Sequence, residues 1–178
     1  MIRSNRARRA LPVLGCLLLA ACATFTGTKR SVPDWGDSLA EVRAMHPGEP
    51  VVEPADRLVY HYELAGVPVT ATYLFDGDGL AERKYFNRAA HDDDNRYIDD
   101  YEHLRDRLIE RHGLPRVDEM AWKNRLFAGQ PERYGDAVAA GHLVYYTEWR
   151  TEQAKIVMAL RGERLQVAHE LVYTPLAE

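Results

Sequence analysis

The sequence predicts an α+β domain with an antiparallel sheet of about six strands covered on one face by helices. Two observations predict this fold. Apolar and polar residues alternate in two groups of three segments, which is the pattern of half-buried strands. Segments with helical spacing lie before and between these groups, and strands grouped apart from helices are typical of α+β folds.

The first part of the domain has the pattern of a helix followed by a three-stranded meander. Ser38 and Glu41 have the spacing of a capping box, so a short helix is predicted over residues 38–46, ending at Pro47-Gly48. Turns are predicted at Ala65-Gly66 and over residues 76–79. The strands predicted on either side of these turns cover residues 57–64, 67–75 and 80–87.

A long amphipathic helix is predicted next, over residues 95–112, because its apolar residues recur at helical spacing. Asp94 or Asn95 would cap its start, and Gly113 would end it. The residues that follow, including Trp122, show no clear period. A shorter helix is predicted from Pro131 to about residue 140.

Three more strands complete the predicted domain, and a two-residue turn at Gly162-Glu163 joins the last two. They cover residues 142–150, 155–161 and 164–173. Their apolar rows are Leu143, Tyr145 and Trp149; Ile156, Met158 and Leu160; and Leu165, Val167, Leu171 and Tyr173. The pattern leaves open whether the two strand groups form one sheet or two.

The first 22 residues have the pattern of an export signal. Four arginines precede an apolar run, Ala10 to Ala21, which is shorter than the roughly 20 residues that span a bilayer. The run ends in Leu19-Ala20-Ala21-Cys22, which resembles the lipobox of bacterial lipoproteins. The resemblance implies cleavage between Ala21 and Cys22 and a lipid on the Cys22 thiol. Ala23 implies sorting to the periplasmic face of the outer membrane in a cell with two membranes. An ordinary signal peptide that happens to end in cysteine is the alternative.

The chain is therefore divided into a signal peptide (1–21), a lipidated tether (22–33) and a single domain (34–178). Removing residues 1–21 from the 178 of the chain leaves 157, which is enough for one domain with a real core. The mature chain has 19 basic and 27 acidic residues, a net charge of −8, because four of the 23 basic residues leave with the signal. Such an acidic chain is a poor candidate for binding nucleic acid or anionic lipid headgroups.

A second resemblance concerns the start of the domain. Trp35-Gly36-Asp37-Ser38, followed by Glu41-Val42, is similar to the start of small SmpA/OmlA-type envelope lipoproteins. Those proteins are short helix-plus-sheet domains that assist a β-barrel assembly complex, so the resemblance implies an envelope protein as partner. The second half of this chain has no counterpart in them.

The sequence offers little chemistry for catalysis. The mature chain has two serines, Ser31 in the tether and Ser38 at a helix start, and neither lies in a nucleophile motif. The acidic runs at residues 91–94 and 76–79 are interpreted as a helix-capping loop and a hairpin turn, with Ca²⁺ binding as the alternative. We therefore predict no catalytic residue, no metal site and no cofactor.

Aromatic residues give the candidate binding surface. Most of them fall within the strand or helix rows and are expected in the core. Trp35, Trp122 and Tyr134 lie outside clear rows and are predicted to form a binding surface. The prediction is a non-enzymatic protein-interaction module of the cell envelope. The alternatives are a periplasmic small-ligand-binding lipoprotein with a cleft between helices and sheet, and a carboxylate-based hydrolase.

Overall fold

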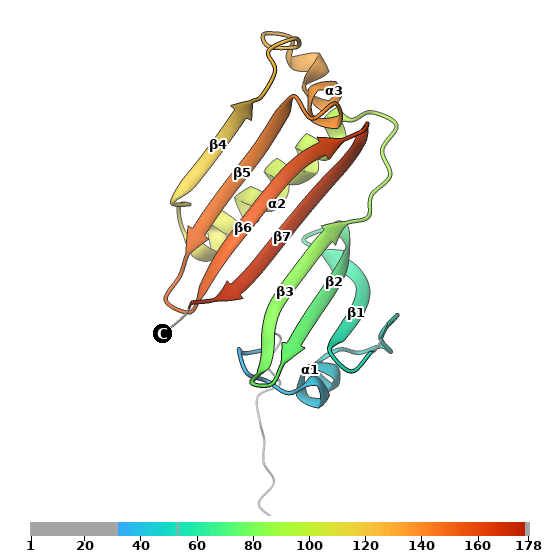
Figure 1. Cartoon of the computed structure of the whole chain (residues 1–178), viewed down its shortest axis with the longest axis vertical. Helices are drawn as coiled ribbons and strands as arrows, with labels where there is room; N and C mark the ends of the chain where they lie inside the picture. Colours follow the sequence, from blue (N-terminus) through green and yellow to red (C-terminus); the bar gives the residue numbers. More distant parts are fainter. Residues whose placement is uncertain (1–31, 53, 177–178) are drawn as a thin grey trace, which may run out of the picture.

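The computed structural model describes residues 32–52 and 54–176 of the chain. The predicted signal peptide, the Ala21–Cys22 cleavage site and the lipidated Cys22 lie outside these residues. The described part is an α+β structure with one antiparallel sheet of seven strands, in the order β1-β2-β3-β7-β6-β5-β4 (Figure 1). None of the helices in the described ranges combines the length and apolar character needed to cross a membrane.

The helices and strands follow the predicted order with one addition. Their bounds are α1 Leu39–Met45, β1 Arg57–Leu64, β2 Val67–Asp76, β3 Gly79–Asn87, α2 Asn95–His112, β4 Val117–Trp122, a 3₁₀ turn Pro131–Arg133, α3 Tyr134–Ala139, β5 Leu143–Arg150, β6 Ala154–Glu163 and β7 Gln166–Pro175. The capping box of Ser38 and Glu41 at the start of α1 is confirmed, with both reciprocal hydrogen bonds present. The predicted ranges of β1 and α2 are confirmed at both ends.

The sheet has seven strands, whereas the sequence predicted about six. The strand that was not predicted is β4. It pairs with β5 at the edge of the sheet, from Val117 opposite Glu148 to Trp122 opposite Leu143. Its four central residues are all exposed, so this strand has no buried face and no alternation of apolar and polar residues. Edge pairing through the backbone leaves no such signal in the sequence.

One sheet contains both strand groups, which answers the question that the pattern left open. The join is antiparallel pairing between β3 and β7, from Arg83 opposite Tyr173 to Phe86 opposite Glu170. This seam is shorter than the neighbouring β6–β7 ladder, which runs from Ala154 to Glu163. Figure 1 shows the β1–β3 group and the β4–β7 group meeting along it.

The turn between β6 and β7 lies two residues later than predicted. Glu163 still pairs with Gln166, and the turn residues are Arg164 and Leu165, both with positive φ. Leu165, predicted in the buried row of β7, is 77% exposed. Gly162 serves a close approach instead, since a Cβ there would lie 2.1 Å from the carbonyl oxygen of Val138 in α3.

The helix α2 lies against the sheet at β6 and β7 (Figure 1), and a chain of hydrogen bonds ties it to β5 and β4. The Tyr101 hydroxyl lies 2.5 Å from Thr147 Oγ1, which donates to Asp118 on β4 at 3.0 Å. Asp94 is the N-cap residue of α2, which is one of the two predicted positions, but its side chain makes no capping hydrogen bond. The Asn95 side chain bonds the backbone of Glu132 and of Gly135, which ties α2 to the start of α3.

Candidate functional site

A cavity of about 810 Å³ lies where the two strand groups meet, at the Arg83–Tyr173 end of the seam. It is bounded by the chain before α1, the end of α1, strands β1, β2, β3, β6 and β7, the end of α2, and the β5–β6 turn. The described lining residues are mostly apolar or aromatic, and their charged members are Asp34, Arg83 and Arg111. Ligand pockets in proteins typically have about this volume and this composition.

Arg83 is the buried charge of this cavity. It stands in a row of cross-strand neighbours that are otherwise apolar or aromatic. That row, in sheet order, is Leu58, Tyr73, Arg83, Tyr173, Ile156 and Trp149. The Arg83 side chain is 8% exposed although it is ionised at every relevant pH.

The partners of Arg83 leave most of its hydrogen-bonding capacity unused. Its Cζ lies 4.4 Å from the ring centre of Trp35 and 4.8 Å from that of Tyr173. One nitrogen, Nη1, donates to the Pro33 carbonyl at the long distance of 3.4 Å, and Nε has no partner in residues 32–52 and 54–176. Among the described residues, no carboxylate pairs with this guanidinium. Cation–π contacts contribute roughly 0.5–2 kcal/mol each, whereas taking a cation out of water costs several kcal/mol.

The sequence analysis missed Arg83 because β3 contains a bulge. Phe75 pairs with Leu80, but Leu74 pairs with Glu82, so Ala81 is an extra residue that changes the phase of the strand. Counted from buried Leu80 without a bulge, Arg83 would face outward. With the bulge it faces inward. The sequence feature that could have indicated the inward position of Arg83 is Tyr85, a large aromatic residue two positions later that lies on the same buried face.

Trp35 is held over Arg83 by backbone pairing with the β2–β3 hairpin. Gly36 N–H donates to the Leu80 carbonyl at 3.1 Å, and Leu80 N–H donates to the Asp37 carbonyl at 2.9 Å. A Cβ on Gly79 would lie 2.2 Å from the Gly36 carbonyl oxygen, so glycine is needed at residue 79 for this close approach. The Trp-Gly-Asp-Ser motif thus has a structural explanation: it positions one wall of the cavity and then starts α1.

Four tyrosines form much of the aromatic lining. The ring centres of Tyr62 and Tyr85 are 6.4 Å apart and those of Tyr85 and Tyr173 are 5.9 Å apart, both edge to face. The hydroxyls of Tyr62 and Tyr73 lie 3.4 Å apart. Burial raises the pKa of Tyr173 to about 12 and also raises the pKa of Tyr62 and that of Tyr73, so these hydroxyls stay protonated and can donate hydrogen bonds.

Two histidines complete the polar lining. His46, at the end of α1, stacks on Tyr60 with ring centres 4.1 Å apart. Burial lowers its pKa, and burial followed by the charges of Arg111 and Arg83 lowers the pKa of His112. These effects favour the neutral form of both rings, and the Nε2 atom of each is buried without a hydrogen-bond partner in the described part of the chain.

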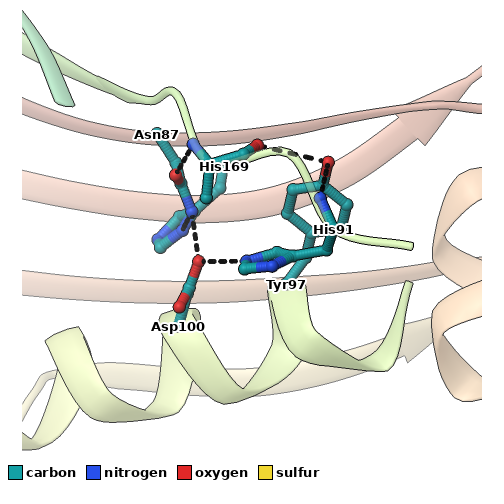
Figure 2. Close-up of polar contacts among 6 residues, drawn as sticks. Asn87, His91, Tyr97, Asp100 and His169 are labelled. Atoms are coloured by element: carbon teal, nitrogen blue, oxygen red, sulfur yellow. Dashed lines mark hydrogen bonds and ion pairs between the residues drawn. The ribbon is translucent and has the colours of Figure 1, made fainter. Parts of the chain in front are cut away.

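A separate polar cluster pins the β3–α2 connection to the sheet at the other end of the seam (Figure 2). Asp100 Oδ2 accepts a hydrogen bond from Asn87 at 2.7 Å and lies 2.8 Å from His91 Nε2. Asn87 Nδ2 also lies 3.4 Å from His169 Nδ1. His169 is 4% exposed, and burial lowers its pKa to about 4. These hydrogen bonds hold the β3–α2 connection against α2 and the sheet, so the cluster has a structural role.

The three predicted binding residues do not form one surface. Trp122 and Tyr134 contact each other edge to face at 5.2 Å, at the end of β4 beside α3. Trp35 lies in the chain before α1 and forms the cavity wall with Arg83, and Figure 1 shows α1 and α3 at opposite ends of the molecule. The structure therefore connects Trp35 with Arg83, and Trp122 with Tyr134.

The acidic runs have local structural partners. Asp76 accepts from the Asp78 N–H at 2.9 Å within the hairpin turn, and Asp93 accepts from the Asn95 N–H at 2.9 Å before α2. In residues 32–52 and 54–176, no three or more His, Cys, Asp or Glu side chains are grouped as metal ligands. Asp34 is the one carboxylate among the described lining residues of the cavity, so that lining offers no carboxylate pair for hydrolysis.

A comparison of the chain with known protein families, curated proteins and solved structures finds no match.

Proposed function

We propose that this chain is a lipid-anchored protein of the bacterial cell envelope that holds a small organic ligand in the cavity. The observation that carries the proposal is the cavity itself, about 810 Å³ between sheet, α1 and the end of α2. Its walls combine large aromatic surfaces with a few inward polar groups, which is the composition of small-molecule sites. The geometry favours the small-ligand alternative of the sequence analysis over the protein-interaction module.

The proposed anchor is a lipid on Cys22. The short apolar run and the Leu19-Ala20-Ala21-Cys22 motif support it, and Ala23 supports the periplasmic face of the outer membrane in a cell with two membranes. Growth with a labelled fatty acid should label the full chain and leave a Cys22→Ala variant unlabelled. Equal labelling of both chains would contradict lipidation at this residue.

We also propose that the helices share one face of the sheet. A single cross-strand row connects Tyr60 on β1 with Thr147 on β5. His46 at the end of α1 stacks on Tyr60, and Tyr101 of α2 contacts Thr147. This arrangement supports a cavity floored by the sheet and bordered by helix ends.

The ligand proposal can be tested with a neutral aromatic probe, 1-naphthaleneacetamide. The full chain, purified from membranes in a non-ionic detergent, is dialysed against the probe beside a detergent-only blank. We expect saturable binding that is lost in Ala154→Phe, which adds a ring to the cavity lining. The matched control is Ala168→Phe, at an exposed position of β7. The absence of saturable binding, or equal binding by Ala154→Phe, would contradict the proposal.

A second candidate function is docking of another envelope protein along β4. This strand is the last of the sheet, its central residues are exposed, and Met120 is 47% exposed. The Trp122–Tyr134 pair lies at its end. Crosslinking in cells should capture a partner that Trp122→Ala and Tyr134→Ala weaken without loss of folding. Unchanged capture would count against this surface.

A further inference from the structure

We propose that the ligand of this cavity is an organic anion whose carboxylate or phosphate group is bound by the guanidinium of Arg83. This inference rests on the proposed ligand-binding function and names the class of ligand. The remainder of the ligand would be an apolar or aromatic body that contacts the tyrosine walls.

Arg83 has unused hydrogen-bonding capacity within the described structure. A guanidinium has five N–H groups, and the described residues supply one weak bond, to the Pro33 carbonyl. Buried charges in proteins are normally paired, and removal of an arginine's partner is strongly destabilising. A buried arginine that the described residues leave without a carboxylate is therefore suited to receive one from a ligand.

Two aromatic rings hold the guanidinium of Arg83 in place. Trp35 and Tyr173 both contact the guanidinium carbon through their ring faces, at 4.4 and 4.8 Å. These contacts restrict the orientation of the group while they make no hydrogen bonds to its N–H edge. A planar N–H edge held in this way matches the two oxygens of a carboxylate or phosphate.

The groups around Arg83 determine the charge of the cavity. Arg111, at the end of α2, is exposed and also lines the cavity. Asp34, the single described carboxylate of the lining, is exposed and has other interactions. His46 and His112 each have a buried, unpartnered Nε2. The described lining thus has two arginines against one exposed carboxylate, and this positive balance favours an anionic headgroup.

The test uses two pairs of probes that differ in charge and share a naphthalene ring. The first pair is 1-naphthaleneacetate and 1-naphthaleneacetamide, and the second is 1-naphthyl phosphate and 1-naphthol. Affinities are measured by equilibrium dialysis of the full chain in detergent with a detergent-only blank. We expect the anion of at least one pair to bind roughly tenfold or more tightly than its neutral partner, as charge-assisted hydrogen bonds predict. The pair with the larger preference identifies the headgroup.

Substitution of Arg83 assigns the preference to this residue. Arg83→Met should reduce the ratio of affinities to about one without loss of the neutral probe. Arg83→Lys keeps the charge, loses the planar fork and should give an intermediate ratio. The matched control, Arg161→Met, removes an arginine that pairs with Glu170 outside the cavity lining, and it should leave the ratio unchanged.

The outcomes separate this inference from the proposed function. If the neutral probe binds but both anions show no preference, or if Arg83→Met and Arg83→Lys keep the wild-type preference, the anion inference is wrong and the cavity proposal stands. If no probe of either pair binds, the proposed function itself is contradicted.

Discussion

The buried His169 should make the stability of this protein depend on pH between about 7 and 4. Burial lowers its folded-state pKa from 6.5 to about 4, so the unfolded chain binds more protons between these values. The free energy of unfolding therefore falls as pH decreases through this window, and the decrease caused by His169 is complete only below about pH 4, where the folded protein also becomes protonated at this ring. A difference of about 2.5 pKa units corresponds to about 3 kcal/mol.

The measurement is urea unfolding of the full chain at pH 7, 6, 5 and 4, followed by circular dichroism. The comparison is His169→Gln, which cannot titrate and keeps a side-chain acceptor for Asn87. Wild type should lose about 3 kcal/mol more than the variant between pH 7 and pH 4, because other titrating groups contribute to both chains. Equal losses in the two chains would refute the assignment of His169 as a buried, neutral histidine.

Three further substitutions test individual contacts of Arg83, Gly79 and Tyr101. Arg83→Met should leave the free energy of unfolding unchanged or raise it by about 1 kcal/mol, because the substitution removes a buried cation that has no carboxylate partner among the described residues. A loss of several kcal/mol in thermal unfolding would mean that Arg83 is structurally paired. Gly79→Ala should lower the free energy of unfolding by about 2 kcal/mol or more, because residue 79 has a positive φ and the new Cβ would clash with the Gly36 carbonyl. The control is Gly77→Ala, which has open space around it, and equal melting temperatures of the two variants would contradict the contact. Tyr101→Phe should lower the free energy of unfolding by about 1–2 kcal/mol, because the buried Thr147 hydroxyl loses a hydrogen-bond partner. Unchanged urea unfolding would argue against that hydrogen bond.

Periodicity made most of the fold predictable. The ranges of β1 and α2 follow from apolar residues that alternate or recur at helical spacing, because each packs one face on the core. The strand β4 could not be found in this way, since its central residues are exposed and backbone pairing with β5 holds it. Gly162 was interpreted as a turn residue, although its role is the tight contact with α3.

The candidate site was harder to predict than the fold. Its walls come from segments far apart in the chain, such as Trp35, Arg83 and Tyr173, and only the sheet register brings them together. Trp35 was identified as a binding residue because it lies outside the core rows. Arg83 could not be assigned to the inner face, because the bulge at Ala81 changes the phase of its strand.

The most direct test of the account places a bound ligand in the molecule by ¹⁹F NMR. The full chain labelled with 5-fluorotryptophan gives one signal for each of its three tryptophans, assigned by single Trp→Phe variants. Addition of 1-naphthaleneacetate should shift the Trp35 signal, since this ring lines the cavity over Arg83, and should leave the signal of Trp122 beside Tyr134 unchanged. A Trp35 signal that does not respond, or a shift confined to Trp122, would contradict ligand binding in this cavity.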